Sequence, residues 1–175
     1  MKRQDVYKRQ VNEIAKAAFE MGKVKTGALI VVERDILLTE YERTGIEVDA
    51  VVSSQLLINI FEHNTPLHDG AVIIRNNRVV AATCYLPLSD NMMLSKDLGT
   101  RHRAGVGVSE VTDSLTIICS EETGSVSVAA GGELERNVTI EQLKQRLGDR
   151  KKQPEEAKRF RIWKGRHKYE KDIDK

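Results

Sequence analysis

Residues 67–85, LHDGAVIIRNNRVVAATCY, decide the fold of this chain. Two apolar runs, 71–74 and 79–85, flank the dipeptide Asn76-Asn77. Asparagine tolerates the positive φ angles of tight hairpin turns, so the pattern predicts a β-hairpin. Asp69-Gly70 stands directly before the first run, where a carboxylate on a glycine turn lets a ligand approach the backbone closely. The stretch therefore predicts a sheet with a candidate catalytic loop at the start of a strand.

Helical and strand-like segments alternate on both sides of this hairpin. Apolar residues recur at helical spacing in some segments, and short β-branched runs bounded by charge or turn residues form the others. Helices are predicted over residues 11–21, 53–62 (with Ser53 as N-cap) and 140–147, and strands over 29–32, 71–74, 79–85, 115–119 and 126–129. The alternation predicts an α/β fold: a single domain with a central mixed β-sheet flanked by helices.

Composition excludes several classes of function. The formal net charge of +2 hides a basic tail, because residues 151–175 hold ten Lys or Arg against five Asp or Glu. Residues 1–150 are therefore mildly acidic, and we expect no nucleic-acid partner. Cys84 and Cys119 lie within apolar runs and show no metal-ligand spacing, which predicts reduced thiols in the core.

A second candidate motif, Thr100-Arg101-His102-Arg103, stands at the expected start of a further helix. Arginine can hold phosphate oxygens with two N–H groups at once, and the free N–H groups of a helix N-terminus favour anions. Together with Asp69, this cluster predicts phosphate chemistry. The chain lacks a Gly-rich phosphate loop ending in Lys-Ser or Lys-Thr and a Gly-x-Ser-x-Gly nucleophile turn.

Glycines follow this basic cluster, in the run Ala104-Gly105-Val106-Gly107-Val108. A glycine in a helix interior costs about 1 kcal/mol relative to alanine. The run therefore predicts a short or loose helix.

Five segments carry the chemistry-bearing residues: Gly27-Ala28-Leu29-Ile30, Asn64-Thr65-Pro66-Leu67-His68-Asp69-Gly70-Ala71-Val72-Ile73, Tyr85-Leu86-Pro87-Leu88, Gly99-Thr100-Arg101-His102-Arg103-Ala104 and Ser120-Glu121-Glu122-Thr123-Gly124. In this order they resemble the diadenylate cyclase domain, which condenses two ATP molecules into cyclic di-AMP. The resemblance covers roughly residues 11–147 and is strongest to the membrane-anchored type. It implies an ATP-binding enzyme that releases pyrophosphate.

The resemblance also implies a metal site and a catalytic carboxylate. It assigns hydroxyl activation and metal contact to Asp69, and metal binding to His68. An imidazole with a carboxylate suits Mn²⁺ or Co²⁺ better than Mg²⁺. From the residues alone, Asp69 could equally form a turn, and His68 could be a hydrogen-bonded loop histidine.

Further residues are implied in catalysis or substrate binding. Arg101 and Arg103 are expected to act in catalysis by gripping phosphate, while a solvated basic helix end is the alternative reading. The full set expected to bind substrate comprises Gly70, Ala71, Tyr85, Leu86, Thr100, Arg101, His102, Arg103, Ser120 and Glu122. Within it, Tyr85 and Leu86 belong to the adenine slot, and Glu122 fits a role linked to the metal.

The product joins two nucleotides through two symmetric linkages, which one protomer holding one ATP cannot complete alone. The resemblance therefore implies a face-to-face homodimer. It also implies a cytoplasmic catalytic domain, anchored to the cell membrane in the full-length protein and open to a membrane regulatory partner. Other readings are a silent nucleotide-binding regulatory module, a metal-dependent phosphohydrolase using His68, Asp69 and Glu122, and a nucleic-acid binder acting through the basic tail.

We accordingly divide the chain into three parts. Residues 1–10 are expected to be an N-terminal linker or a remnant of another segment, 11–150 the diadenylate cyclase catalytic domain, and 151–175 a basic charged C-terminal tail.

Overall fold

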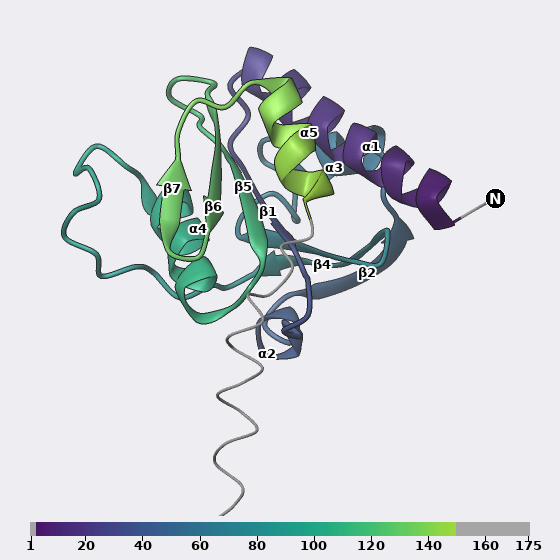
Figure 1. Ribbon diagram of the computed structural model, residues 1–175, viewed down its shortest axis with the longest axis horizontal. Coiled ribbons are helices and arrows are strands. Elements are labelled where there is room, and N and C mark those ends of the chain that lie inside the picture. The colour runs from purple at the N-terminus through teal and green to yellow at the C-terminus, as the bar shows by residue number, and fades with distance from the viewer. Residues whose placement is uncertain (1–2, 150–175) are drawn as a thin grey trace, which may run out of the picture.

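Strand β1 (Ala28–Val32) lies near the middle of a seven-stranded mixed sheet in the computed structural model, which describes residues 3–149 (Figure 1). The strand order is β2-β4-β3-β1-β5-β6-β7. The other strands are β2 (Ile46–Val51), β3 (Ala71–Arg75), β4 (Arg78–Cys84), β5 (Leu115–Cys119), β6 (Val126–Ala130) and β7 (Glu133–Glu135). Among these residues, β1 with β3 is the single parallel pair, and the remaining pairs are antiparallel. The predicted mixed sheet is confirmed.

Five helices accompany the sheet within the described residues: α1 (Arg3–Lys23), α2 (Thr39–Glu42), α3 (Ser54–Phe61), α4 (Thr100–Val111) and α5 (Ile140–Gly148). Residues 3–10, which the sequence interpretation assigns to a linker, form the first part of α1. The Tyr7 hydroxyl there donates a hydrogen bond to the carbonyl oxygen of Leu147 at the end of α5. The predicted tail, 151–175, lies outside the described residues.

The two faces of the sheet carry separate apolar clusters because neighbouring side chains of a strand point to opposite sides. Ala28 and Ile30 of β1 pack in one cluster with residues of α1, α3 and α5. Leu29 and Val31 pack in the other cluster with residues of α4. The helices accordingly cover opposite faces of the sheet (Figure 1).

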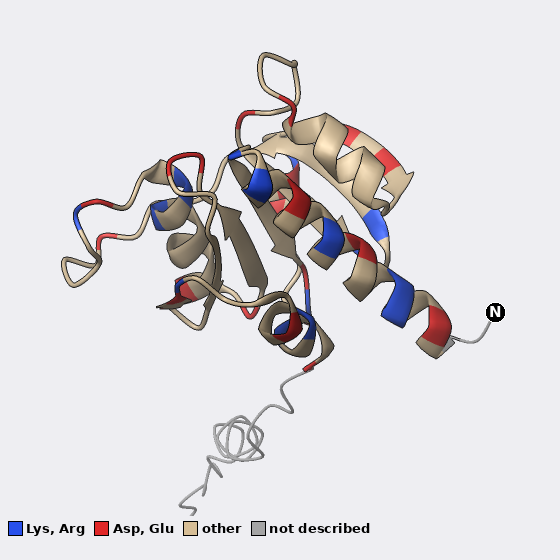
Figure 2. Ribbon diagram, turned by 90° about the horizontal axis from the view of Figure 1, so that it is seen from above, with Lys and Arg blue, Asp and Glu red and all other residues tan. Residues whose placement is uncertain are grey.

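Local signals fix several of these boundaries. Ser53 caps α3, where its hydroxyl oxygen accepts a hydrogen bond from the backbone N–H of Leu56. Asn76 and Asn77 have φ angles of 47° and 63°, as the predicted hairpin turn requires. Acidic and basic residues alternate along the exposed side of α1, as on an ordinary solvated helix (Figure 2). No helix within residues 3–149 is long and apolar enough to cross a membrane.

Both cysteines are free and buried, as predicted. Burial raises the pKa of Cys84 to about 11 and the pKa of Cys119 to about 12. Both groups are therefore protonated thiols at neutral pH.

Helix α4 is continuous over twelve residues, so the prediction of a short or loose helix is wrong. Its glycines are sites of close packing. A Cβ on Gly105 would lie 2.9 Å from Ile118 Cδ1, and a Cβ on Gly107 would overlap the carbonyl oxygen of Pro87. The chain at 87–89 crosses directly over the helix, where the backbone N–H of Ser89 donates to the carbonyl oxygen of Arg103 at 2.9 Å. Glycine lowers the helix propensity at these positions, but the absence of a Cβ lets α4 pack closely against β5 and this crossing segment.

Replacing Gly107 by alanine should destabilise the protein, because the crossing segment must shift to admit the new methyl group. We expect the free energy of unfolding, measured by urea denaturation, to fall by about 1–3 kcal/mol. Gly148→Ala is the matched control, since a Cβ at Gly148 meets nothing within 4 Å. Equal unfolding free energies for the two variants would contradict this account of α4.

Candidate functional site

Four loops meet at one edge of the sheet because of its strand directions. β1 and β3 are parallel, so both begin at this edge. Ala28 of β1 pairs with Cys119 at the end of antiparallel β5, and Ala71 of β3 pairs with Cys84 at the end of β4. The edge therefore gathers the segments before β1, before β3, after β4 and after β5. These segments carry Gly27, Asp69, Tyr85 and Ser120.

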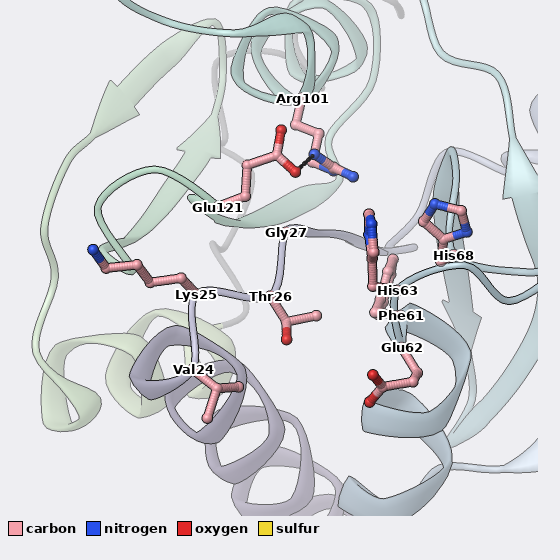
Figure 3. A pocket seen from close by; sticks show the side chains of 10 residues that line it. All are labelled: Val24, Lys25, Thr26, Gly27, Phe61, Glu62, His63, His68, Arg101 and Glu121. Carbon is pink, nitrogen blue, oxygen red and sulfur yellow. Dashed lines mark ion pairs between the residues drawn. The ribbon is translucent and has the colours of Figure 1, made fainter.

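Two hollows open at this edge. The larger, of about 450 Å³, is lined by Val24, Lys25, Thr26, Gly27, Phe61, Glu62, His63, His68, Arg101 and Glu121 (Figure 3). The smaller, of about 150 Å³, is lined by Asp97, Leu98, Gly99, Thr100, Arg101, His102, Cys119, Ser120, Glu121, Glu122, Thr123, Ser125 and Arg136. Arg101 and Glu121 belong to both linings, so this pair separates the two hollows.

An ion pair joins these two residues, with 3.0 Å between Arg101 Nη1 and Glu121 Oε2. The Arg101 side chain is 23 % exposed and that of Glu121 is 61 % exposed. Gly27 lies against the pair, since a Cβ at this position would stand 2.7 Å from Arg101 Nη1. A larger residue at position 27 would push the guanidinium away, so the glycine is part of the site.

The loop between α3 and β3 is held by its own hydrogen bonds. The Thr65 hydroxyl donates to the carbonyl oxygen of Glu62 at 2.7 Å, and Nδ1–H of His68 donates to the carbonyl oxygen of Thr65 at 2.6 Å. The Nε2 atom of His68 remains available to a ligand. Asp69 is exposed, and its Oδ1 accepts a hydrogen bond from the N–H of Gly70 at 3.0 Å.

Gly70 has a φ of +89°, and a Cβ there would lie 2.9 Å from Thr83 Cα. Both facts require glycine at this position. Its neighbour Ala71, the first residue of β3, is fully buried and packs in the core directly after the loop.

The two arginines at the start of α4, Arg101 and Arg103, face different surroundings. Residues two apart on a helix do not share a face, and only Arg101 lines the hollows. Arg103 is half-buried beside the segment at 87–89. Thr100 is exposed at the first turn and lines the smaller hollow.

His102 is 8 % exposed and also lines the smaller hollow. Burial, followed by the positive charge of Arg136, lowers its pKa. The imidazole is therefore neutral at neutral pH and can donate one hydrogen bond.

The loop after β5 is ordered around Ser120. Its hydroxyl oxygen accepts the backbone N–H groups of Glu122 at 3.3 Å and Thr123 at 3.2 Å, which leaves the hydroxyl proton to donate to a ligand. The loop also abuts the end of α1, because a Cβ on Gly22 would stand 2.5 Å from the carbonyl oxygen of Gly124. Glu122 is exposed at the rim of the smaller hollow.

Tyr85 and Leu86 follow the end of β4, and both residues lie outside the two hollows. The backbone N–H of Tyr85 donates to the Thr44 hydroxyl oxygen at 2.8 Å, and this hydroxyl donates to the carbonyl oxygen of Tyr41 at 2.6 Å. The Tyr85 side chain is 75 % exposed. The structure thus fixes the backbone here and leaves the ring on the open surface next to the site.

The hollows bring together only part of the expected set, namely His68, Thr100, Arg101, His102, Ser120 and Glu122. Asp69, Gly70, Tyr85 and Leu86 lie at the same edge but outside the hollows. The sequence interpretation did not assign a role to His63 or Glu121. Gly27 and Glu121 lie within segments that resemble the family, so the sequence offered a signal for both residues. His63 lies one residue before such a segment, and the sequence offered no other signal for it.

Comparisons with known proteins identify the family of this chain. Residues 15–134 match the family described as DisA bacterial checkpoint controller nucleotide-binding. Over 144 residues the chain is 58 % identical to cyclic di-AMP synthase CdaA of Bacillus subtilis (strain 168), covering 82 % of this chain and 53 % of that protein.

Two solved structures are also similar. The crystal structure of a double mutant of DacA from Staphylococcus aureus matches with a TM-score of 0.78 and 48 % identity, over 79 % of this chain and 93 % of that one. A hypothetical membrane spanning protein from Bacillus cereus matches with a TM-score of 0.71 and 42 % identity, over 73 % of this chain and 63 % of that one.

Fold and site together define a nucleotide-binding α/β domain with a mixed sheet. More particularly, the chain belongs to the DisA bacterial checkpoint controller nucleotide-binding family, within which it resembles the CdaA and DacA proteins. The chain spans about half the length of the curated relatives it matches.

The lowered pKa of His102 makes the stability of the fold depend on pH. The imidazole of the unfolded chain, with a pKa of about 6.5, binds a proton more readily than the folded one. Stability is thus fully present above about pH 6.5 and falls as the pH drops below it. In His102→Gln, urea denaturation at about pH 7 and about pH 5 should show a smaller loss of unfolding free energy than in the wild type. An equal loss in both proteins would show that His102 does not cause it.

Proposed function

We propose that this chain is the catalytic domain of a diadenylate cyclase, which condenses two ATP molecules into cyclic di-AMP and two pyrophosphates. The observation that carries the proposal is the common edge, where Arg101 and Ser120 line the hollows and the exposed Asp69 carboxylate lies outside them at the same edge. Relatives with 58 % identity are named cyclic di-AMP synthase and diadenylate cyclase.

The residues suit adenylyl transfer. In each of two steps a ribose 3′-oxygen forms a bond to the α-phosphorus of the other ATP, and the bond from that phosphorus to the pyrophosphate oxygen breaks. Asp69 accepts the hydroxyl proton. Arg101, with Thr100 and Ser120, donates hydrogen bonds to the phosphate oxygens and stabilises the charge that develops on them. Arg103, half-buried beside the site, adds positive charge to the same edge.

Recognition of the base is assigned to the end of β4. Tyr85 offers an exposed ring for contact with adenine, and the backbone of Leu86, next to the hydrogen-bonded N–H of Tyr85, offers polar groups to its edge. Gly70, which lacks a side chain, lets the nucleotide approach the backbone.

The side chains of His68 and Asp69 offer a donor set that fits a divalent metal ion. The Nε2 atom of His68 and the Asp69 carboxylate would hold Mn²⁺, Co²⁺ or Mg²⁺, and we assign a metal-linked role to Glu122 at the rim of the smaller hollow. Residues 3–149 contain no group of three or more His, Cys, Asp or Glu able to hold a metal, so ATP phosphates would complete the coordination. When bound, the ion would offset phosphate charge.

A homodimer follows from the symmetry of the reaction. Asp69 and Tyr85 both lie on the open surface at the edge of the sheet, where a second protomer can bring its own nucleotide. We further propose that the domain faces the cytoplasm, where ATP is available, and that the full-length protein is anchored to the cell membrane, where a regulatory partner can reach it. A relative described as membrane spanning supports the anchoring.

Replacing Asp69 by asparagine should abolish the reaction while preserving the fold, because the amide cannot accept the hydroxyl proton. We expect cyclic di-AMP formation from ATP and Mn²⁺, followed by chromatography, to fall at least roughly 100-fold. Asp149→Asn, an exposed aspartate after α5, is the control. Wild-type protein that binds ATP without turnover would instead indicate a regulatory module, and release of AMP or phosphate would indicate a phosphohydrolase.

Activity should also depend on dimerisation. At saturating ATP, the rate per protomer should fall in proportion to protein concentration once the protein is diluted below its dimer dissociation constant. Sedimentation at the same concentrations reports the oligomer. A constant rate per protomer where sedimentation shows monomers would refute the two-protomer reaction.

A further inference from the structure

The end of β4 is irregular just before the segment that we assign to the base. Residues 81–84 of β4 pair with residues 71–73 of β3, so β4 holds one extra residue there and carries a bulge. Thr83 within the bulge has a φ of 57°, which a β-branched residue rarely adopts. Such a conformation persists only where its surroundings impose it, and bulges next to active sites redirect the chain that follows. Contacts around the bulge therefore set the direction in which Tyr85 leaves the sheet.

Neighbouring backbone lies against this bulge from two sides. On the β3 side, a Cβ on Gly70 would stand 2.9 Å from Thr83 Cα. On the β2 side, a Cβ on Gly45 would overlap the carbonyl oxygen of Ala82 and would stand 2.5 Å from Cys84 Sγ. The segments that precede β3 and β2 thus both lie directly against the end of β4.

Thr44, in the segment between α2 and β2, makes the hydrogen bond that follows the bulge. The pairing of β2 with β4 stops at Ile46 and Ala82, so the backbone N–H of Tyr85 lies beyond the ladder. The Thr44 hydroxyl oxygen accepts this N–H at 2.8 Å, and the same hydroxyl donates to the carbonyl oxygen of Tyr41 at 2.6 Å. One side chain thus joins the end of β4 to α2 through both its acceptor and its donor.

Helix α2 is itself fixed to the sheet. Arg75 at the end of β3 contacts Glu42 of α2 at 2.7 Å and Glu33, which follows β1, at 2.6 Å. The Glu33 side chain is only 3 % exposed, so this network is anchored in the protein interior. Tyr41 packs against the apolar cluster on the α4 side of the sheet. Thr44 is therefore attached to a fixed support and can hold the backbone of Tyr85 in place.

We propose that Thr44 is a positioning residue for base recognition, because its hydroxyl sets where the backbone of Tyr85 and Leu86 meets the adenine. The inference rests on the proposed function, which assigns adenine to this segment. Thr44 lines neither hollow, so the phosphate transfer step does not use it. Loss of the hydroxyl therefore weakens the binding of the nucleotide and leaves the rate of transfer unchanged.

Calorimetric titration of AMP into the 175-residue chain tests this proposal, because AMP carries the base and has no pyrophosphate to release. Thr44→Val keeps the branched shape and removes both hydrogen bonds. We expect this variant to bind AMP roughly two- to tenfold more weakly. In the cyclic di-AMP assay, KM for ATP should rise by a similar factor while kcat stays unchanged, as for an interaction made equally in the ground state and the transition state.

Two further variants separate positioning from a general effect on the fold. Thr44→Ser keeps the hydroxyl and should restore both the AMP affinity and KM. Thr39→Val is the matched control, because Thr39 is an exposed threonine of α2 whose hydroxyl makes no hydrogen bond within residues 3–149. Thr44 is also exposed, so none of these substitutions removes a core contact, and urea denaturation should give similar unfolding free energies for all of them.

An AMP affinity that stays unchanged in Thr44→Val would overturn the proposal, as would a wild type that binds no AMP. A Thr44→Ser variant that binds as weakly as Thr44→Val would also overturn it. Failure of the proposed function is recognised separately. A wild type that makes no cyclic di-AMP but depends on the Thr44 hydroxyl for AMP binding would retain the positioning role and lose the cyclase. A wild type that makes cyclic di-AMP, with AMP binding independent of Thr44, would retain the cyclase and lose the positioning role.

Discussion

The pairing of β1 with parallel β3 on one side and antiparallel β5 on the other is the constraint on which the site depends. Because β1 is buried on both faces, its register cannot slip by one residue without exchanging the side chains that serve the two apolar clusters. This fixed register carries the segments before β1 and β3 and the segment after β5 to one edge. Residues far apart in sequence therefore meet there through strand pairing.

Local chemistry made much of the fold predictable. The Ser53 cap, the Asn76-Asn77 turn and the period of the apolar residues each act over a few positions, so they could be recognised in the sequence. β7 was missed because only three residues form it, and the start of α1 was missed because its first residues are polar. The glycines of α4 led to the wrong prediction of a short or loose helix for a different reason. Their packing partners at Pro87 and Ile118 come from distant segments, which local sequence does not reveal.

The site was predictable as a set of segments, and much less as a set of contacts. Thr100 to Arg103 stand together in the sequence, but a helix turns about 100° per residue, so Arg101 and Arg103 face different surroundings. The partner of Arg101 is Glu121, and it becomes a partner only through the approach of β5 to β1 at Gly27. No spacing rule connects these three residues, because the sheet and not the local chain brings them together.

The Arg101–Glu121 pair also explains how the site can be ordered before the nucleotide arrives and still accept it. The pair holds the guanidinium above Gly27, so that little reorganisation is needed on binding. An ion pair with a partner as exposed as Glu121 is worth only about 0–1 kcal/mol. Phosphate oxygens accept two hydrogen bonds from one guanidinium and can replace the carboxylate at low cost. A buried partner would orient Arg101 equally well, but exchange with substrate would then leave an unpaired charge inside the protein. The exposure of Glu121 thus reconciles a preformed position of Arg101 with the exchangeable phosphate contact that we propose for it.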